Sequence, residues 1–497
     1  MNISLILQMA GDAEPDRIGL VCDGRRWSYG SLLRAAQGAA TLFTQSGATH
    51  VALLDESSEA APIALFGAAI AGIPYVPLNY RLADADLAAL LQRIAPAFVV
   101  GDVERVNRLN PTQKHVTQSR AQFVAAAESA EPNTESVEDG EAVAVQLFTS
   151  GTTAAPKAAI LRHANLLGYI LGTVEFGSAS PDEASLFSVP PYHIAGIAGL
   201  MSSIYSLRRM VFLPAFDPDT WLKLASSEKV TNAFVVPTML ARVVQRMDAG
   251  VRPDLSSLQA IAYGGGRMPT ELIERALDLF PNVGFTNAYG LTETSSTIAL
   301  LGPDDHRAAH RSTDPKVRAR LGSVGKPLPT VEIEIRDEEG RKLPQGERGE
   351  IYVRGEQVSG EYKERKAIGA DGWFPTRDAG YIDEEGYLFL AGRTDDVIVR
   401  GGENLSPGEI EDVLMTHPAI ADAAAVGVPS VEWGEAVGIA VVIRPGHTRP
   451  SDDELRALIK DRLRSSRVPE KIAVLNALPY NEMGKLLRRE VRAQLRQ

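Results

Sequence analysis

The chain has 497 residues, of which 44% are hydrophobic and 23% charged, which is typical of a globular protein too long for one hydrophobic core. Its net charge of −12 argues against nucleic acid as a partner. Its one cysteine, Cys22, excludes an internal disulfide framework and a cysteine-rich zinc site, and fits a reducing compartment, most simply the cytoplasm.

Helical and strand patterns alternate through the first 130 residues. They predict helices at 31–45 and 60–71, and strands at 50–54, 75–78 and 98–102. Strands and helices that alternate at this spacing are typical of a mostly parallel sheet with helices on its faces. No apolar run approaches the roughly 20 residues that a membrane helix needs, so no transmembrane segment is expected.

A strand predicted at 142–148 leads into the sequence TSGTTAAPK. This loop contains four hydroxyls, a glycine and a lysine, which are Thr149, Ser150, Gly151, Thr152, Thr153 and Lys157. Glycine lets the backbone approach closely, hydroxyls and amides donate hydrogen bonds, and lysine supplies a charge, so such a loop can wrap an anion. It is not a Walker A loop, because the lysine stands between a proline and an alanine. A solvated turn is the alternative that the loop alone leaves open.

Two later segments place polar or flexible residues just after a predicted strand. The segment 187–193 runs from a strand into a turn and ends at His193, a candidate catalytic residue, because ligands of open α/β sheets bind at strand ends. A lone histidine is more often structural. The strand at 260–263 runs into three consecutive glycines, Gly264, Gly265 and Gly266, on which a flat ring can lie. A tight turn is the alternative for the glycines.

The segment 285–294 offers groups suited to a phosphate and a metal ion. Thr292 supplies a hydroxyl, and Glu293 supplies the hard carboxylate oxygen that Mg²⁺ prefers. These two residues are therefore candidate catalytic residues, with Glu293 the candidate metal ligand.

From residue 331 the pattern changes to short strands and turns. Strands at 332–337, 349–355 and 386–392 predict a small β meander, and a helix is predicted at 407–415. The last hundred residues hold equal numbers of acidic and basic residues, so all of the negative charge lies before them. Their basic C-terminal part is suited to steering a phosphorylated small molecule, although a solvated helix face is an equal alternative.

Four stretches, in this order and spacing, resemble the adenylate-forming superfamily of acyl- and aryl-CoA synthetases, luciferases and peptide-synthetase adenylation domains. They are TSGTTAAPK at 149–157, YGLTE at 289–293, GWFPTRD at 372–378 with GRTDDVIVRGGENLSPGEIE at 392–411, and NEMGK at 481–485. The ordered set is far more specific than any one of its members, and it covers nearly the whole chain.

The resemblance implies an α/β fold with a large N-terminal domain of several subdomains, built from βαβ sheets plus a small β-barrel. A small α+β C-terminal domain would follow on a hinge. The implied boundaries are 1–392 for the N-terminal adenylation domain, 393–396 for the hinge, which includes Asp395, and 397–497 for the C-terminal lid domain.

The resemblance also implies how ATP and Mg²⁺ would bind. The loop at 149–157 would enclose the β- and γ-phosphates, and Glu293 would hold Mg²⁺. Thr292 would bind the α-phosphate and the region of the substrate carboxylate. Lys485 would be the catalytic lysine of adenylation. The remaining nucleotide contacts would come from Gly264, Gly265, Gly266, Asn287, Ala288, Tyr289 and Gly290 for the adenine, from Asp378 for the ribose, and from Arg393 for the ribose or phosphate.

The second half of the implied reaction uses coenzyme A. The C-terminal domain would rotate, remove the lysine and present another face, on which Gly401 and Gly402 leave room for the pantetheine arm. Trp433 would stack on the nucleotide of coenzyme A, although a core tryptophan is the alternative. Arg467 would meet the phosphates of coenzyme A.

The sequence departs from the usual pattern at four positions. Ala154 and Ala158 replace glycines of the phosphate loop, which would strain the backbone if either position needs a positive φ. Arg377 stands where a small residue usually precedes the ribose aspartate, and would reach solvent, pair with the acidic N-terminal domain, or touch the nucleotide. Ser466 replaces a common aromatic residue near the expected coenzyme A site.

The leading hypothesis is an ATP-dependent carboxylic acid–CoA ligase. The acid pocket is expected among 193–199, 263–266 and 288–299, which are small and apolar and have no basic residue nearby except Arg267, so a monocarboxylic fatty, alicyclic or aryl acid is expected. The partners would be this acid, ATP and coenzyme A, with homodimer formation left open. The alternatives are an adenylating enzyme that loads a carrier protein or releases acyl-AMP, and a nucleotide-binding regulatory protein without chemistry.

Overall fold

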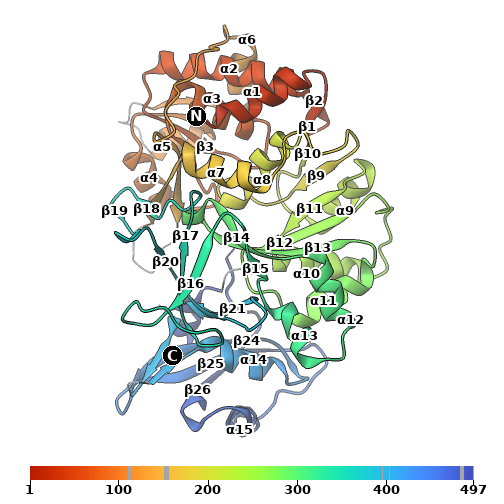
Figure 1. Ribbon diagram of the computed structural model, residues 1–497, viewed down its shortest axis with the longest axis vertical. Helices are drawn as coiled ribbons and strands as arrows, with labels where there is room; N and C mark the ends of the chain where they lie inside the picture. Colours follow the sequence, from red (N-terminus) through yellow and green to blue (C-terminus); the bar gives the residue numbers. More distant parts are fainter. Residues whose placement is uncertain (110–114, 150–155, 394–395, 402, 482–485, 496–497) are drawn as a thin grey trace.

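The computed structural model describes residues 1–109, 115–149, 156–393, 396–401, 403–481 and 486–495. Figure 1 shows the N-terminal helices at one end of the molecule and the C-terminal sheet at the other, with the strands of residues 332–393 between them. No helix in these ranges is both long and apolar enough to cross a membrane.

The first large sheet has eight strands in the order β19-β18-β8-β7-β4-β3-β5-β6. Its strands are β3 (His50–Leu54), β4 (Tyr75–Pro77), β5 (Ala97–Gly101), β6 (Val116–Gln118), β7 (Val143–Thr149), β8 (Lys157–Arg162), β18 (Glu361–Tyr362) and β19 (Arg365–Lys366). The five strands from β3 to β7 pair in parallel, as the alternating pattern predicts, and β8 returns antiparallel to β7. The helices of this part of the chain are α1 (Ser4–Ala13), α2 (Tyr29–Ser46), α3 (Ala60–Ala71), α4 (Asp84–Arg93), α5 (Val103–Leu109), α6 (Arg120–Ser129) and α7 (His163–Thr173).

Helix α3 has the bounds that the sequence predicts, and its composition explains its place. Its side chains are apolar all round, and every residue from Ala60 to Ile70 is buried. A helix without a polar face is stable only inside a protein, and α3 packs between the sheet and α2. It ends at Gly72, whose φ of 70° is the left-handed conformation that closes many helices.

The second large sheet has nine strands in the order β15-β14-β13-β12-β11-β9-β10-β1-β2. Its strands are β1 (Ile18–Cys22), β2 (Arg25–Ser28), β9 (Ala184–Phe187), β10 (Arg209–Phe212), β11 (Asn232–Val235), β12 (Ala260–Gly264), β13 (Gly284–Leu291), β14 (Ser296–Leu301) and β15 (Lys326–Pro327). The helices between them are α8 (Ile194–Tyr205), α9 (Pro218–Ser227), α10 (Pro237–Asp248), α11 (Thr270–Leu279), α12 (Pro303–Arg311) and α13 (Pro315–Ala319). Strands β9 to β13 pair in parallel with one another, so the ends of β12 and β13 meet at one edge, and β14 returns antiparallel to β13.

A four-stranded antiparallel sheet follows, in the order β16-β17-β20-β21. Its strands are β16 (Glu332–Arg336), β17 (Gly349–Arg354), β20 (Phe374–Ile382) and β21 (Leu388–Arg393). The predicted meander is present, but the small β-barrel expected here is wrong, because β16 and β21 remain open edges in the described residues. Four strands do not give enough circumference to close around a core of side chains. One face instead packs on residues of β13 and β14.

The C-terminal sheet consists of β23-β22-β25-β24, with β26 beside β25. Its elements are β22 (Ile398–Arg400), β23 (Glu403–Leu405), α14 (Pro407–Met415), β24 (Ile420–Ser430), β25 (Gly434–Ile443), α15 (Asp452–Arg462), β26 (Lys471–Leu475) and α16 (Arg488–Gln494). No strand pairing joins this sheet to the other three among the described residues. The α/β class with a large N-terminal and a small α+β C-terminal domain is thereby confirmed. The hinge stays a prediction, because Asp395 lies outside the described residues.

Candidate active site

The ends of the predicted phosphate loop are held together by a strand pair. Thr149 ends β7 and lies opposite Lys157, which begins β8. Arg93 adds a second tie, because one of its Nη atoms donates to the Pro156 carbonyl at 2.6 Å and its guanidinium lies 4.8 Å from the ring of Phe148. The loop residues between, which include Ser150, Gly151, Thr152, Thr153 and Ala154, lie outside the described residues.

The alanine that follows the loop lysine causes no strain. Ala158 is fully buried inside β8, where it pairs with Phe148, and its φ is not positive. A side chain is therefore tolerated where the family usually has glycine. The backbone strain considered for Ala158 does not occur.

The predicted metal ligand lies in a tight turn between β13 and β14. A short 3₁₀ helix, η1 (Thr292–Thr294), is followed by Ser295 and Ser296 with φ of 55° and 122°. Non-glycine residues with positive φ cost energy and persist where the surroundings enforce them. Here Gln357 Nε2 donates to the carbonyls of Thr294 and Thr297 at 3.0 and 2.8 Å. This contact holds the turn from outside.

The carboxylate of Glu293 is buried, with 8% of the residue exposed. Its backbone carbonyl accepts from the amides of Ser359 and Gly360 at 2.9 and 3.1 Å, and its Oε1 accepts from Tyr362 Oη at 2.6 Å. Burial, followed by the charge of Glu293, raises the pKa of Tyr362, so the phenol stays protonated and donates. Hydrogen bonds thus hold both the main chain and the side chain of Glu293 in place.

The surroundings of Glu293 fit a bound Mg²⁺. The hydroxyls of Ser295 and Ser359 are buried and have no hydrogen-bond partner among the described residues, which is the state of groups that await a ligand or its water shell. No group of three or more His, Cys, Asp or Glu side chains forms a ready metal cage in the described part of the chain. Mg²⁺ commonly binds through one or two carboxylates plus substrate phosphates, so one buried carboxylate is a sufficient protein ligand.

The glycines predicted to hold the adenine lie where the backbone leaves no room for a side chain. A Cβ on Gly264 would be 2.4 Å from the Ala288 carbonyl oxygen, and Gly265 has a φ of 80°. A Cβ on Gly290 would be 1.8 Å from the Ser296 carbonyl oxygen. Gly266 follows directly, and β12 pairs with β13 so that Gly264 lies opposite Ala288. These strand ends form one closely packed wall.

Asn287 also lies on this wall, where its side-chain amide donates to the Ser323 carbonyl at 3.0 Å.

Tyr289, Asp378 and Arg393 come together although they are far apart in sequence. Tyr289 Oη donates to Asp378 Oδ2 at 2.6 Å, and Arg393 Nη1 lies 3.5 Å from Asp378 Oδ1. Burial, followed by the charge of Asp378, raises the pKa of Tyr289 and keeps it a donor. Asp378 is 14% exposed, so it is oriented by its neighbours yet reachable by a ligand.

Arg377 adopts the conformation that a glycine would take at its position. Its φ is 64°, and its Nε lies 3.8 Å from Glu350 Oε1. Its backbone amide donates to the same carboxylate at 3.2 Å. Two of the outcomes considered for this residue are therefore observed together, because its side chain is 53% exposed to solvent and also lies beside Glu350 of the N-terminal domain. A contact with the nucleotide stays a prediction.

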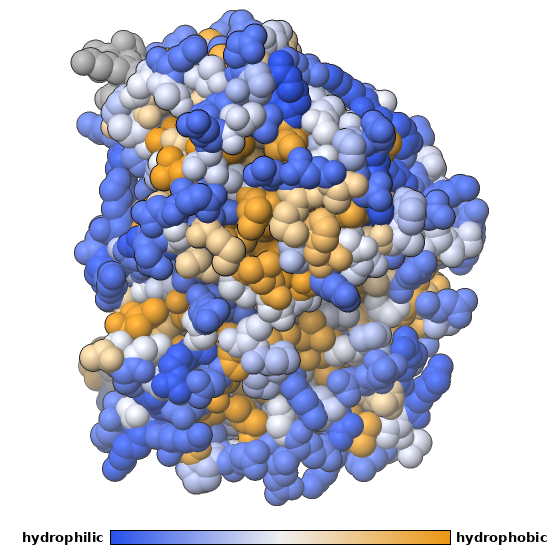
Figure 2. Space-filling model, turned by 45° about the horizontal axis from the view of Figure 1, so that its top comes forward, coloured by the Kyte–Doolittle hydropathy of each residue, from blue (hydrophilic) through white to orange (hydrophobic). Residues whose placement is uncertain are grey.

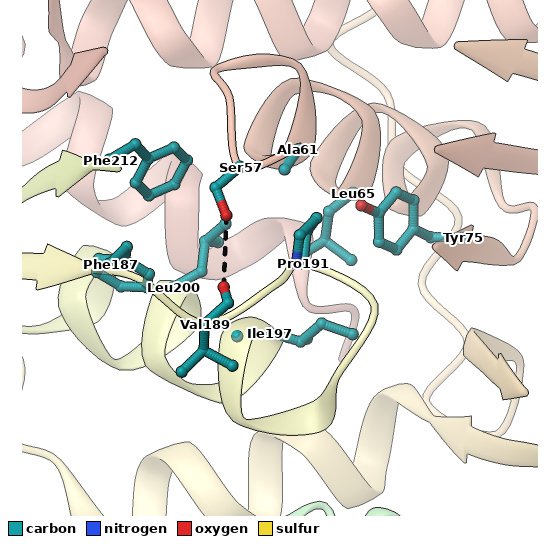
Figure 3. A pocket seen from close by; sticks show the side chains of 11 residues that line it. Ser57, Ala61, Leu65, Tyr75, Phe187, Val189, Pro191, Ile197, Leu200 and Phe212 are labelled. Carbon is teal, nitrogen blue, oxygen red and sulfur yellow. Dashed lines mark hydrogen bonds between the residues drawn. The ribbon is translucent and has the colours of Figure 1, made fainter. Parts of the chain in front are cut away.

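His193 is the N-cap residue of α8 and lies against Tyr192, with 4.7 Å between the ring centroids. Burial lowers the pKa of His193 to about 4, so its ring is neutral at physiological pH. Next to it, α8 and α3 enclose an apolar cavity of about 20 Å³ (Figure 3), enough for roughly one water molecule. The cavity is lined by Ser57, Ala61, Leu65, Tyr75, Phe187, Val189, Pro191, Gly196, Ile197, Leu200 and Phe212. Only Gly196 and Ile197 of the expected acid pocket belong to it.

Ion pairs dock the small domain onto the large one. They are Arg267 with Asp412, Arg348 with Glu409, and Arg444 with Glu271. Ser406 Oγ also donates to the Ala391 carbonyl at 2.6 Å. Arg267, the one basic residue expected near the acid pocket, thus forms an ion pair with Asp412 of α14.

Figure 2 shows a face on which apolar groups gather near the middle of the molecule and hydrophilic groups surround them.

Lys485 itself lies outside the described residues, but the residues that flank it are placed. Tyr480 and Leu486, on either side of it, form an isolated antiparallel bridge. Arg488 forms an ion pair with Glu411, and its Nε lies 3.4 Å from Oδ2 of Asp396 in the predicted hinge. Tyr480, Glu411 and Arg488 all interact electrostatically with Arg267, which directly follows the three glycines. The residues that flank the lysine segment therefore lie near Arg267 and the end of β12.

The predicted coenzyme A residues that the structure describes lie in connections of the small domain: Gly401 follows β22, Trp433 precedes β25, and Arg467 ends a short 3₁₀ helix, η4 (Ser465–Arg467). Gly401 has a φ of 55°, and its amide donates to the Trp433 carbonyl at 2.9 Å. Trp433 is 40% exposed and lies 5.2 Å from the Arg400 guanidinium, so it is not a core residue. Arg467 pairs with Glu403 and Glu409, so in this arrangement its charge is already compensated. Gly402 lies outside the described residues.

Sequence reasoning missed Arg93, Gln357 and Tyr362, which support the site without belonging to a ligand motif. Arg93 ends α4, and Tyr362 lies on a strand of two residues. No spacing rule marks such residues, because their partners are more than 60 positions away in the chain.

Comparison with known proteins agrees with this geometry. The family model described as AMP-binding enzyme matches residues 7–363, and the AMP-binding enzyme C-terminal domain matches residues 409–485. The chain is similar to the fatty acid–[acyl-carrier-protein] ligase ScoC of Streptomyces coeruleorubidus, with 32% identity over 96% of this chain and 93% of that protein. It is also similar to a 2-succinylbenzoate–CoA ligase of Bacillus thuringiensis, with 35% identity over 70% of this chain and 69% of the relative.

Among solved structures, the chain is similar to O-succinylbenzoate coenzyme A synthetase of Bacillus subtilis in complex with ATP and magnesium ion. The TM-score is 0.82 at 28% identity, and the match covers 99% of both chains. The first family model spans well over half of the sequence, and both relatives are named as ligases. The chain therefore belongs to the family of AMP-binding enzymes and is an adenylate-forming, AMP-releasing ligase.

Proposed function

We propose that the enzyme is an ATP-dependent carboxylic acid–CoA ligase. It converts a carboxylate and MgATP to acyl-AMP and pyrophosphate, and then transfers the acyl group to the sulfur of coenzyme A with release of AMP. The observation that supports this proposal is that Glu293 and Lys157 both contact the side chain of Tyr362. Tyr362 donates to the Glu293 carboxylate at 2.6 Å, and Lys157 Nζ lies 5.9 Å from the centre of the same ring. The carboxylate proposed to bind the metal and the ammonium proposed to bind phosphate thus contact the same tyrosine.

The first half-reaction needs positioning and positive charge rather than a general base. The substrate carboxylate is already ionised and attacks the α-phosphorus while pyrophosphate leaves. Mg²⁺, held by Glu293 and the phosphates, would supply positive charge to the non-bridging oxygens. In this proposal Thr292 contacts the α-phosphate, Lys157 and Lys485 bind phosphate oxygens, and Asp378 accepts from the ribose hydroxyls, with Arg393 beside it.

The neutral ring of His193 supports a role next to the acid. With its pKa lowered to about 4, His193 carries no charge at pH 7 and does not act there as a cation. Arg267, the one basic residue expected near the acid pocket, is paired with Asp412 in this arrangement. This arrangement favours a monocarboxylic fatty, alicyclic or aryl acid. The known activities of the relatives differ, since one is named for fatty acids and the other for 2-succinylbenzoate.

The second half-reaction requires the small domain to turn about the proposed hinge at 393–396. The three ion pairs between the domains are largely exposed, and exposed pairs contribute only about 0–1 kcal/mol each. In this proposal the docked domain excludes water while acyl-AMP forms, and the docking is weak enough to be released. The turn would then bring Gly401, Gly402 and Trp433 to the acyl-AMP and the thiol.

A carrier protein is the second candidate acceptor. A relative that matches 96% of this chain is named for acyl-carrier-protein as the acceptor, which keeps this alternative open. The regulatory alternative has no such support, because the matched relatives are named as enzymes. The cytoplasm is the proposed place of action, in line with the free, buried Cys22.

The test is AMP release from ATP with a panel of acids, with coenzyme A, with a phosphopantetheinylated carrier protein, and with neither. The proposal expects acyl-CoA and AMP in equal amounts with the preferred acid. Acyl-carrier protein without acyl-CoA would instead establish the second acceptor, and acid-dependent pyrophosphate exchange without any thioester would leave an adenylating enzyme.

A further inference from the structure

One short strand joins the two parts of the nucleotide site. Tyr362 of β18 pairs with Ala159 of β8, two residues after Lys157. The segment just before β18 supplies the amides of Ser359 and Gly360 to the Glu293 carbonyl. The strand therefore contacts both the strand that carries the phosphate-loop lysine and the turn that carries the metal carboxylate.

The side chain of Tyr362 also contacts both Glu293 and Lys157. Its hydroxyl donates to Glu293 Oε1 at 2.6 Å, and its ring faces Lys157 Nζ at 5.9 Å, within the range of a cation–π contact. Arg365 lies 5.7 Å from the same ring. Next to the strand, Arg162 holds Glu361 with two hydrogen bonds of 2.9 Å, which fixes β18 against β8.

The hydroxyl determines how the carboxylate of Glu293 is presented. A buried carboxylate with one oxygen bound to a phenol has its rotation fixed, and its other oxygen is left to meet a cation. Groups that orient metal ligands in this way change metal affinity by about 10–100-fold when they are removed.

We propose that Tyr362 is a positioning residue for Mg²⁺: its hydroxyl sets the Glu293 carboxylate for the metal, and its ring keeps the Lys157 ammonium beside the phosphates. This inference rests on the proposed function, in which Glu293 is the metal ligand. It predicts that the hydroxyl acts through the metal and that the ring acts through the lysine.

The experiment is a Mg²⁺ titration of ATP binding, followed by calorimetry or with a fluorescent ATP analogue. For Tyr362→Phe we expect a 10–100-fold higher Mg²⁺ requirement, with the affinity for ATP in EDTA unchanged because the ring remains. Tyr387→Phe is the matched control, because Tyr387 Oη donates to Asp305 at 2.7 Å and neither residue is part of the site. It should leave the Mg²⁺ requirement unchanged.

A double-mutant cycle keeps the inference testable if Tyr362→Phe also lowers stability. On a Glu293→Gln background, Tyr362→Phe should cause no further change in the Mg²⁺ requirement, because both changes act on one ligand. Equal Mg²⁺ requirements for wild type and Tyr362→Phe, or full additivity in the cycle, would overturn the proposal. Failure of the proposed function gives a different result, namely a wild-type protein whose ATP binding does not respond to Mg²⁺ at all.

Discussion

Replacing Gly290 by alanine tests whether the Glu293 turn must keep its shape. A Cβ at Gly290 would lie 1.8 Å from the Ser296 carbonyl oxygen, 2.5 Å from its carbonyl carbon and 2.8 Å from Thr297 Cα. All three are backbone atoms, so no side chain can rotate away. The base of the turn must open by more than 1 Å to reach even the shortest distance that real Cβ atoms show.

The structure gives the size of the expected effect. Overpacking of this kind costs about 1–3 kcal/mol of stability. A displacement of about 1 Å in a positioning element can lower a rate by roughly 100-fold. We therefore expect Gly290→Ala to remain folded and to lose about 100-fold in kcat/KM for acid-dependent ATP–pyrophosphate exchange.

The control for this prediction is Gly322→Ala, because a Cβ at Gly322 meets nothing within 4 Å and Gly322 has no positive φ. It should keep the wild-type exchange rate, and unfolding in urea should report the stability of both variants. Wild-type exchange in a folded Gly290→Ala protein would refute the claim that this turn positions the metal carboxylate.

Three further predictions concern the lysine, the hinge and pH. Lys485→Ala should abolish acyl-AMP formation but still make thioester from supplied acyl-AMP, and equal loss of both halves would refute this division of labour. Asp395→Pro should do the reverse, sparing pyrophosphate exchange while thioester formation from acyl-AMP is lost, because a fixed φ hinders rotation at the proposed hinge. Burial lowers the pKa of His163 from 6.5 to about 4 in the folded chain, while its Nδ1 accepts from the Ile3 amide at 3.2 Å. The unfolded chain therefore binds a proton first as the pH falls, and stability should be lost between pH 6.5 and 4. For the 2%-exposed His163 this amounts to about 3 kcal/mol. Urea unfolding across this window should show a loss smaller by about that amount in His163→Asn, and the same pH dependence in both proteins would contradict the assignment.

Sequence patterns predicted helices and strands well where local residues, such as an apolar run or a helix-capping residue, decide the structure. Helices α3 and α14 have their predicted bounds, because an all-apolar run and a Ser-Pro start mark them in the sequence. The pairing of β1 with β10 was not predicted, since it joins segments almost 190 residues apart and no local signal encodes it. The expected barrel was wrong because closure depends on strand number and curvature rather than on the pattern of any one strand.

The candidate site divides in the same way. Glu293 was proposed as a site residue from its chemistry and Asp378 from the family resemblance, and the close packing around Gly264 and Gly290 gives a physical reason for those glycines. Residues that hold these side chains in place, such as Tyr362, were not predicted. In the sequence, a tyrosine on a two-residue strand looks like any surface tyrosine, and only the fold brings it to its partner Glu293.

The most direct measurement of the central claim is the fate of oxygen in the substrate acid. The preferred acid, labelled with ¹⁸O in both carboxylate positions, is incubated with the enzyme, MgATP and coenzyme A, and the products are analysed by mass spectrometry. Attack of the carboxylate on the α-phosphorus, as proposed around Glu293 and Lys157, predicts one ¹⁸O in AMP for each acyl-CoA formed. Label in inorganic phosphate instead, or AMP without label, would contradict the account.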